Sequence, residues 1–200
     1  LQQLNLGPNV ITMIPHSMLR IESMGFEASV TRDPTQAEIN DMQRLLGDGL
    51  KIGYAGFSTD SLPFHYLANQ PNCHKTIPTQ FAKYDEIKQL TQIVRDAGML
   101  WQATPPKDSP AKVLQMFLLS CARLHGKPLK TTVVAALDVS TNRNLIKMAR
   151  LLSRMLNSRF LGGEFYMQAL GARFKIWSDG AVTPIAEEIP ELRALNETDL

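Results

Sequence analysis

The chain has 200 residues, 44% of them hydrophobic, and its 21 Lys and Arg against 19 Asp and Glu give a net charge of +2. This near balance gives no electrostatic reason to expect a nucleic acid or another polyanion as a partner. No apolar run reaches the ~18 residues that a membrane span requires. The length fits one domain over residues 1–200, and we take cytoplasmic origin as the default for a chain with two cysteines.

The amino-terminal part of the chain predicts little regular structure. It begins at Leu1 rather than at a methionine, which indicates an excised segment of a longer protein, and it lacks the basic flank and apolar stretch of a signal peptide. Residues 9–14 are β-prone and end at a proline, and residues 15–20 form a loop or a short helix. We expect residues 21–34 to be irregular, because glycine and proline interrupt them.

The clearest local signal is a helix over residues 36–52 that leads into a strand over 54–58. Thr35 and Glu38 have the spacing of a capping box, in which a hydroxyl and a carboxylate satisfy backbone N–H groups at a helix start. Apolar residues recur on one face at helical period, at Ile39, Met42, Leu46 and Leu50. Gly53 ends the helix. The strand stops at small polar residues, and chemistry sits at such strand ends in parallel α/β folds.

Beyond this strand the chain alternates helices with strands. A long connection over 59–82 comes first, and loops of this length are often functional. The later elements that we predict are helix 84–97, strand 99–104, a helix over 110–125 capped by Ser109, strand 129–137, helix 142–157 and strand 164–169. Strands that alternate with amphipathic helices at this spacing predict βαβ units and a parallel sheet.

Five such units fit two architectures, a doubly wound sheet or most of an eight-unit (β/α)8 TIM-type barrel. No glycine-rich phosphate loop follows the first strand, so a dinucleotide-binding doubly wound sheet has no support. A partial barrel leaves sheet edges unpaired, and such edges invite pairing with another chain. The second architecture therefore predicts self-association.

The histidines and cysteines of the later chain have simple structural explanations. His65, Cys73 and His74 share the long connection but lack a recognised zinc-ligand spacing, so we expect ordinary loop residues. Cys121 falls on an apolar stripe and should be buried, which disfavours a disulfide with Cys73. His125 precedes a glycine at a helix end, where a cation faces the carbonyl end of the helix dipole.

Short segments follow one another along residues 9–105 in a characteristic order. They are Asn9-Val10, His16-Ser-Met-Leu-Arg20, Met24-Gly25, Pro34-Thr35, Glu38-Ile39, Met42, Leu45-Leu46, Gly56-Phe-Ser-Thr59, Pro78, Phe81-Ala82, Asp85-Glu86 and Met99-Leu-Trp-Gln102. In this order they resemble the D-aminoacylase-like (N-acyl-D-amino-acid deacylase) branch of the amidohydrolase superfamily. The resemblance implies a metal-dependent barrel that hydrolyses an amide or related C–N bond. The chain would be an interior segment of about five to six parallel βα units, incomplete at both ends and without the family's β-sandwich.

The chain departs from this family where the family binds its metal. The family's His-x-His pair and its catalytic aspartate would lie before Leu1 and after Leu200. The places of two further histidine ligands fall at about Ala103 and Val133, and alanine and valine cannot coordinate zinc. The resemblance therefore implies no metal centre within this segment, and zinc in the full-length protein would depend on other residues.

The resemblance and the strand ends together give candidate substrate-binding residues, with no catalytic residue assigned. His16 and Arg20 match a His-x-x-x-Arg of the family, and they either orient a substrate carboxylate or hold the loop against its neighbours. Ser58 and Thr59 end the second strand, where we expect hydrogen bonding at the barrel mouth. Without Gly-x-Ser-x-Gly we expect no nucleophilic serine. Gln102 lies beside an expected ligand position, and it either contacts the substrate or fills the barrel.

Three functions stay open at this point. The first is a segment of an enzyme that hydrolyses a small molecule, an N-acyl amino acid or a cyclic amide, through a metal-activated water. The second is a degenerate, non-catalytic relative that keeps the barrel and binds a ligand or a partner. The third is an unrelated α/β protein, and strand order separates it from the other two.

Overall fold

The sheet is the organising element of the fold, seen in a computed structural model that describes residues 10–62, 65–67, 71–72, 75–106, 109–136 and 144–169. Within these ranges, the strands are β1 (Ile14–Pro15), β2 (Gly56–Asp60), β3 (Leu100–Thr104), β4 (Lys130–Ala136) and β5 (Glu164–Ala169). The helices are α1 (His16–Met24), α2 (Phe26–Ser29), α3 (Gln36–Lys51), α4 (Tyr84–Asp96), α5 (Pro110–Phe117), α6 (Ala122–His125) and α7 (Leu145–Leu156), with 3-10 turns η1 (Pro78–Phe81) and η2 (Leu118–Ser120).

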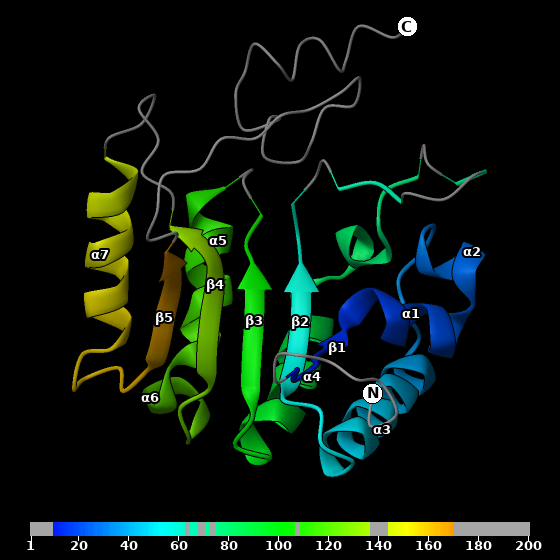
Figure 1. The fold of residues 1–200 in the computed structure, drawn as a ribbon, viewed down its shortest axis with the longest axis horizontal. Helices are drawn as coiled ribbons and strands as arrows, with labels where there is room; N and C mark the ends of the chain where they lie inside the picture. The colour runs from blue at the N-terminus through cyan, green and yellow to red at the C-terminus, as the bar shows by residue number, and fades with distance from the viewer. Residues whose placement is uncertain are drawn as a thin grey trace, which may run out of the picture.

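Strand order decides between the two architectures. The five described strands form one parallel sheet in the order β1-β2-β3-β4-β5, without the reversal that defines a doubly wound sheet. Because crossovers between parallel strands are right-handed, successive units place their helices on one side, and Figure 1 shows α4 and α5 behind the strands. The described fold is therefore an arc of five parallel strands that alternate with helices, part of a TIM-type barrel, which confirms the predicted fold class.

Helix α3 confirms the strongest local prediction. Thr35 Oγ1 accepts a hydrogen bond from the Glu38 backbone N–H at 3.3 Å, and Glu38 Oε2 accepts one from the Thr35 backbone N–H at 2.7 Å. The four apolar positions of the predicted stripe are all buried. Gly53, just after the helix, has a φ of 112°, a conformation that glycine adopts without strain.

The amino-terminal prediction needs correction. Of the β-prone run over 9–14, the structure describes residues 10–14, and among these only Ile14 lies in a strand, which Pro15 completes beside β2. Residues 21–34 are not irregular throughout, since they contain the end of α1 and all of α2. A tertiary contact accompanies the helix that local pattern did not indicate. His16 and Arg20, one turn apart on α1, both pair with Glu86, a distant residue of α4.

The predicted helix over 110–125 is also interrupted. Ser109 caps α5 as predicted, with its side chain accepting from the Lys112 backbone N–H, but Cys121 is extended and a separate helix, α6, follows it. At this break the backbone bonds to a distant segment, with Cys121 bridging Gly163 and Ala122 N–H donating to the Gly162 carbonyl at 3.3 Å. These hydrogen bonds to a segment about forty residues later replace the helical hydrogen bonds. The local periodicity of the sequence cannot reveal them.

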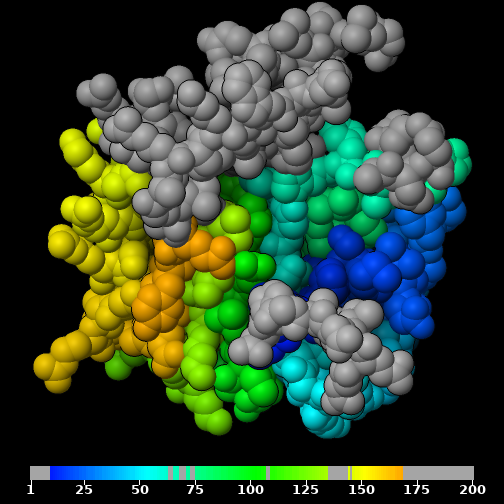
Figure 2. All heavy atoms as spheres, viewed as in Figure 1, coloured from blue at the N-terminus to red at the C-terminus, as the bar shows by residue number. Residues whose placement is uncertain are grey.

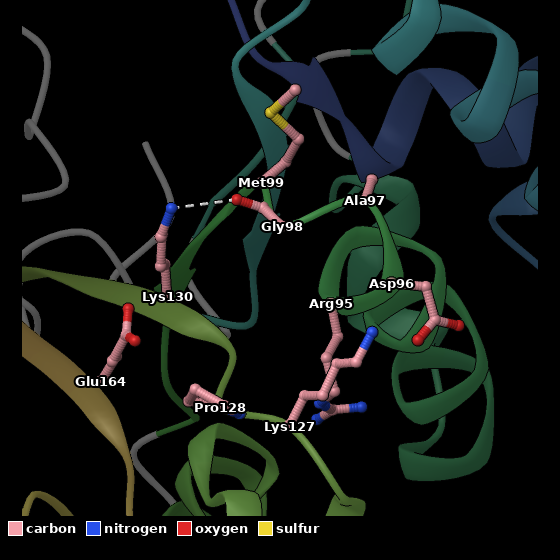
Figure 3. Close-up of a pocket in the computed structure, with 9 residues that line it drawn as sticks. All are labelled: Arg95, Asp96, Ala97, Gly98, Met99, Lys127, Pro128, Lys130 and Glu164. Carbon is pink, nitrogen blue, oxygen red and sulfur yellow. Dashed lines mark hydrogen bonds between the residues drawn. The ribbon is translucent and has the colours of Figure 1, made fainter.

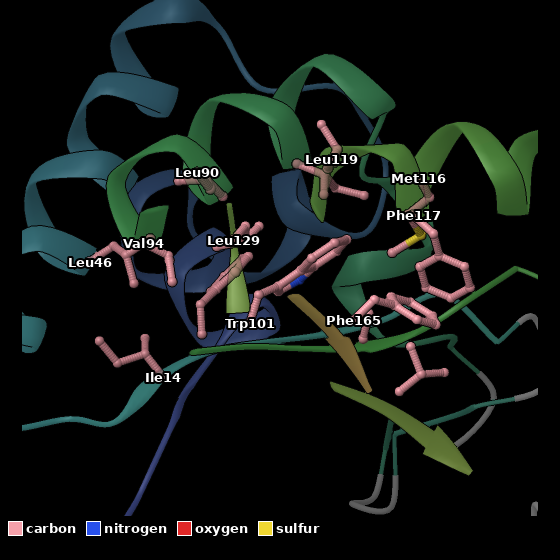
Figure 4. Close-up of a cluster of buried hydrophobic side chains, with 14 of the residues drawn as sticks. Ile14, Leu46, Leu90, Val94, Trp101, Met116, Phe117, Leu119, Leu129 and Phe165 are labelled. Carbon is pink, nitrogen blue, oxygen red and sulfur yellow. The ribbon is translucent and has the colours of Figure 1, made fainter. Parts of the chain in front are cut away.

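One hydrophobic core fills the space between the sheet and its helices. Phe57, Trp101 and Phe165 are fully buried on the helix-facing side of three strands, and Figure 4 shows Trp101 and Phe165 among the side chains of this cluster. The Phe117 and Phe165 rings meet at 4.8 Å between centroids in an edge-to-face arrangement. Since strand side chains alternate between faces, the residues next to these three strand positions point to the opposite, open face.

The outer face of α7 carries large apolar side chains. Met148 is 62% exposed, Leu151 70% and Met155 40%, and Figure 2 shows the side chains of this helix projecting at one edge. Their i, i+3, i+7 spacing places them on one stripe of the helix. In the described part of the chain, no helix is both long enough and apolar enough to cross a membrane.

Candidate functional site

Polar side chains gather on the open face near the carboxyl ends of the strands. Ser58 of β2 lies beside Gln102 of β3, which lies beside Thr132 of β4, so one rung of the sheet is polar across three strands. One rung further toward the strand ends, Asp60 lies beside Thr104. The carboxyl edge of a parallel sheet is where ligands bind in folds of this kind, so this polar edge is the candidate site.

The structure brings two of the predicted substrate-binding residues together on this face. Ser58 and Gln102 are direct neighbours across β2 and β3, and both are partly buried. Further along the face, Gln168 Nε2 donates a hydrogen bond to Thr132 Oγ1 at 3.0 Å. The edge therefore offers hydroxyl and amide groups, which donate and accept hydrogen bonds without carrying charge.

Asp60 and His65 form a side-chain pair at the same edge. The Asp60 carboxylate accepts a hydrogen bond from the Leu62 backbone N–H at 3.0 Å and pairs through its other oxygen with His65 Nδ1. Sequence reasoning treated His65 as an ordinary loop residue and did not select Asp60. The available signal was a carboxylate that ends a buried strand five residues before a histidine. Cys73 and His74, which shared the predicted loop, lie outside the described residues.

His16 and Arg20 lie behind the sheet, in a buried cluster with Glu86. His16 Nε2 lies 2.8 Å from Glu86 Oε1, and Arg20 Nη1 lies 2.5 Å from Glu86 Oε2. Arg20 also donates to the backbone carbonyls of Ser29 and Arg32 at 3.2 and 3.0 Å. The structure thus pairs both residues within the protein, and contact with a substrate carboxylate stays a prediction.

Glu86 holds its negative charge inside this cluster. Burial opposes the charge, but the hydrogen bonds and positive charges of His16 and Arg20 outweigh burial and hold the pKa of Glu86 below its usual range. The His16 ring also packs against Phe57, with centroids 5.1 Å apart. Sequence reasoning missed the role of Glu86, although a glutamate one helical turn before the buried Leu90 was a visible anomaly on the inward face of α4.

Thr59, the remaining candidate, also faces the helices. Its side chain is 2% exposed, and its hydroxyl accepts a hydrogen bond from Trp101 Nε1 at 3.1 Å. Because strand side chains alternate between the two faces, Ala103 and Val133, where the family would have histidine ligands, point toward the core. A metal ligand on the open face of β3 would have to stand at the position before or after Ala103. These positions hold Gln102 and Thr104.

A metal centre does not fit the residues that the structure describes. Among them, no group of three or more His, Cys, Asp or Glu side chains is placed to hold an ion. Asp60 and His65 supply two donors at the strand edge, whereas zinc sites use at least three protein ligands. No step of a mechanism is therefore assigned to a metal in this chain.

A cleft of about 320 Å³ lies at the opposite end of the sheet. Arg95, Lys127, Lys130 and Glu164 line it beside the end of α4 and the starts of β4 and β5, as Figure 3 shows. Lys130 Nζ donates to the Gly98 carbonyl at 3.1 Å. None of the residues predicted to bind substrate lies here, so the cleft and the polar edge are separate features.

The structure tests the predictions made for Cys121 and His125. Cys121 is a fully buried free thiol, as its apolar stripe predicts, and burial raises its pKa. His125 ends α6, but burial, with Arg95 and Lys88 nearby, lowers its pKa. The cationic form that we expected at this helix end is therefore disfavoured.

Comparison with known proteins gives relatives that have no assigned activity. No family model matches the chain. Uncharacterized proteins of Mycobacterium tuberculosis (strains H37Rv and CDC 1551) and Mycobacterium bovis are 30% identical over 189 residues, which cover 92% of this chain. The chain spans about a third of the length of these relatives, 31%.

Solved structures give a likeness in fold. An N-acyl-D-glutamate deacylase from Bordetella bronchiseptica, complexed with zinc and a phosphonate inhibitor, superposes with a TM-score of 0.51 at 20% identity, over 80% of this chain and 30% of its own. Two D-aminoacylase structures, one in complex with copper chloride, give a TM-score of 0.51 at 21% identity over 77% of this chain and 28% of theirs. The chain therefore shares the α/β fold of these structures, that of part of a TIM-type barrel.

Proposed function

We propose that the chain is an interior segment, a single domain over residues 1–200, of a D-aminoacylase-like amidohydrolase. The full-length protein would hydrolyse a non-peptide C–N bond, in an N-acyl amino acid or a cyclic amide. The observation that carries this proposal is the arc of five parallel strands in chain order with a polar carboxyl edge. The likeness of its fold to the deacylase and D-aminoacylase structures supports it. We place the protein in the cytoplasm, with a small molecule as its ligand.

The candidate residues divide into two groups by their position. Ser58 and Gln102 lie on the open face, and we propose that they contact the substrate through neutral hydrogen bonds. His16, Arg20 and Thr59 lie between the sheet and the helices, and we propose that they hold the strand ends in place behind the site. Positioning of this kind matters because a displacement of about 1 Å can cost about 100-fold in rate.

Zinc in the full-length protein would have to be held by residues other than those described here. When bound, such an ion lowers the pKa of a coordinated water to about neutrality and polarises a carbonyl. The described residues contribute hydrogen-bonding groups at the strand edge and the buried supports behind it.

The test is metal analysis and hydrolysis by the full-length protein. We expect about one equivalent of zinc or another divalent metal per chain. We also expect turnover on a panel of N-acyl amino acids of both hands and cyclic amides, lost on chelation and restored by the metal. Less than one equivalent of metal together with no turnover across the panel would contradict the hydrolase proposal.

A second function, a non-catalytic barrel that binds a ligand or a partner, is favoured by one observation. The open-face positions of β3 and β4 near the expected ligand sites hold Gln102, Thr104 and Thr132 instead of histidine. Saturable binding of an N-acyl amino acid without turnover, in metal-supplemented full-length protein, would support this second function over the first.

A further inference from the structure

Arg95, in the last turn of α4, is a buried cation without an acidic partner. It is 3% exposed. Its Nη1 donates to the Gln92 side-chain oxygen and its Nη2 to the Leu119 carbonyl, and both acceptors are neutral. Among the residues that the structure describes, no carboxylate forms an ion pair with Arg95, and its Nε has no hydrogen-bond partner. Buried charges are normally paired, so this guanidinium departs from the usual pattern.

The surroundings of Arg95 are electrically positive. Burial lowers the pKa of the Arg95 guanidinium, and the charges of Asp96 and Tyr84 act in the opposite direction. Burial also lowers the pKa of His125, and the positive charges of Arg95 and Lys88 add to this effect. A negative charge placed beside Arg95 would therefore be attracted to it.

The cleft of about 320 Å³ at the amino end of the sheet gives access to this region, because Arg95 lines it. Lys127, from the turn before β4, lines the same cleft and is exposed. Like Arg95, Lys127 forms no ion pair within the described ranges. Two cations from different elements therefore border one cleft, and neither is neutralised by an acid of the described chain.

Two acids also line the cleft, but they do not neutralise this pair of cations. Glu164 is the strand neighbour of Lys130, so these two charges partly offset each other. Asp96 is exposed, accepts a hydrogen bond from a side-chain amide of α4 at 2.9 Å, and is screened by solvent. Figure 3 shows Asp96 and Glu164 on opposite sides of the cleft, with Arg95 and Lys127 between them.

We propose that this cleft binds a small dianion, a free phosphate or the phosphate group of a small molecule, between Arg95 and Lys127. Two cations without an acidic partner match the two negative charges of such a group. Guanidinium and ammonium groups both bind phosphate oxygens through charge-assisted hydrogen bonds. The cleft lies at the other end of the sheet from the polar edge, so the proposal does not rest on the proposed function.

Calorimetric titration of the full-length protein with inorganic phosphate tests the proposal. The titration is run at about pH 8, where phosphate is a dianion, and chloride keeps the ionic strength constant. We expect saturable binding, with a thermal unfolding midpoint that rises with phosphate concentration, because a ligand of the folded state stabilises it. Acetate carries a single charge and should bind at least about tenfold more weakly.

Two variants and a control locate the binding, since a metal elsewhere in the full-length protein could also bind phosphate. Lys127→Gln removes an exposed charge without disturbing the core and should raise the Kd about tenfold. Arg95→Met removes the buried charge but keeps a long apolar side chain, and it should raise the Kd by at least as much. Lys147→Gln makes the same change as Lys127→Gln at an exposed position of α7, and the Kd should not change.

A second titration, with glycerol 3-phosphate, distinguishes the two sources of the dianion. Tighter binding than that of inorganic phosphate would identify a phosphorylated small molecule as the ligand, whereas equal or weaker binding would identify free phosphate. Either result, with weaker binding in Lys127→Gln and unchanged binding in Lys147→Gln, supports the site.

Three results would overturn the site. The first is no saturable binding below about 10 mM phosphate. The second is a phosphate affinity that Lys127→Gln and Lys147→Gln change equally or not at all. The third is acetate that binds as tightly as phosphate. Each of these results leaves the hydrolase proposal standing, because that proposal is tested by turnover and metal content.

Discussion

At the scale of single residues, Glu86 is the side chain on which the packing of α1 depends most. It is 2% exposed and joins two buried partners, His16 and Arg20, that come from a helix about seventy positions earlier in the chain. Removing one member of a buried ion pair leaves an uncompensated charge, which costs about 3–5 kcal/mol. The cluster is therefore sensitive to any change that removes its negative charge.

Glu86→Ala should lower the free energy of unfolding by about 3 kcal/mol or more, because it leaves Arg20 buried without its carboxylate. Urea denaturation followed by circular dichroism measures this change. Asp85→Ala, an exposed acid at the adjacent position of α4, is the control and should change stability by less than about 0.5 kcal/mol. Equal effects of the two variants would show that the buried cluster contributes nothing specific.

The lowered pKa of Glu38 should make the stability of the protein depend on pH in the acid range. Its hydrogen bonds to Arg32 and to the Thr35 backbone lower its pKa from 4.5 to about 2. A carboxyl group with a lowered pKa in the folded state stabilises the protein above its unfolded pKa, and this contribution is lost as the pH falls through the folded value. Stability should therefore fall between about pH 4.5 and pH 2.

Glu38→Gln should remove this part of the acid dependence, because glutamine does not titrate. At pH 7 it should lower stability by less than about 1 kcal/mol, since glutamine can keep the capping contact but loses the ion pair with Arg32. Thermal unfolding from pH 7 to pH 2 measures both effects. A variant whose stability falls with pH as steeply as that of the wild type would show that Glu38 titrates normally in the folded state.

Gln102 tests the polar edge directly. If its side chain on the open face contacts substrate, Gln102→Leu should raise KM about tenfold in the full-length protein, the cost of about one hydrogen bond. Gln89→Leu replaces a glutamine whose hydrogen bonds reach residues of α3, and KM should not change. An unchanged KM in Gln102→Leu would place substrate contact elsewhere.

At the scale of elements, the close approach of β2 and β3 depends on Gly56. A Cβ atom at this position would lie 1.8 Å from the Leu100 carbonyl oxygen, so any side chain would force the two strands apart. These strands carry Ser58, Asp60 and Gln102, the centre of the polar edge. The packing at Gly56 therefore sets the geometry of the candidate site.

Gly56→Ala should destabilise the protein by several kcal/mol, beyond the range of ordinary substitutions. Gly47→Ala is the matched control, because Gly47 lies inside α3 and its added Cβ would meet Ile93 at an ordinary 3.8 Å. The control should gain about 0.5–1 kcal/mol from the better helix propensity of alanine. Chemical denaturation of both variants gives the comparison, and a fully stable Gly56→Ala would contradict the observed strand register.

Elements with strong local signals could be predicted from the sequence, and those set by distant contacts could not. The capping box and apolar stripe of α3, and the strand over 164–169, lie where local pattern puts them. The break at Cys121 and the helices within residues 15–34 depend on Gly162, Gly163 and Glu86, which no short window contains. The same holds for the candidate site. Strand ends and alternation indicate that Ser58 and Gln102 belong to it, and the structure places them side by side. The contact between Asp60 and His65 depends on how the loop after β2 folds, which no local pattern shows.

At the scale of the whole molecule, the described sheet ends at β1 on one side and β5 on the other. An edge strand presents unpaired backbone groups that a second chain can pair with. We therefore propose that the 200-residue chain self-associates through its sheet edges. The exposed apolar stripe of α7 is a second surface that could contribute.

Light scattering over a range of concentrations should show a mass above that of one 22.3 kDa chain. Tyr166→Lys adds a charge to β5 and should lower the mass, since charged edge strands resist pairing. Leu151→Lys changes the α7 stripe and should leave the mass unchanged if the sheet edge is responsible. A monodisperse monomer at all concentrations would contradict self-association.

The proposed function requires the ligand to lie at the carboxyl edge of the sheet, and NMR mapping of the full-length protein with an N-acyl amino acid shows where it binds. We expect saturable amide shift changes at Ser58, Asp60, Gln102 and Thr104, with none around the cleft of Arg95, Lys127 and Lys130. Shift changes confined to that cleft, with the strand ends unaffected, would contradict it.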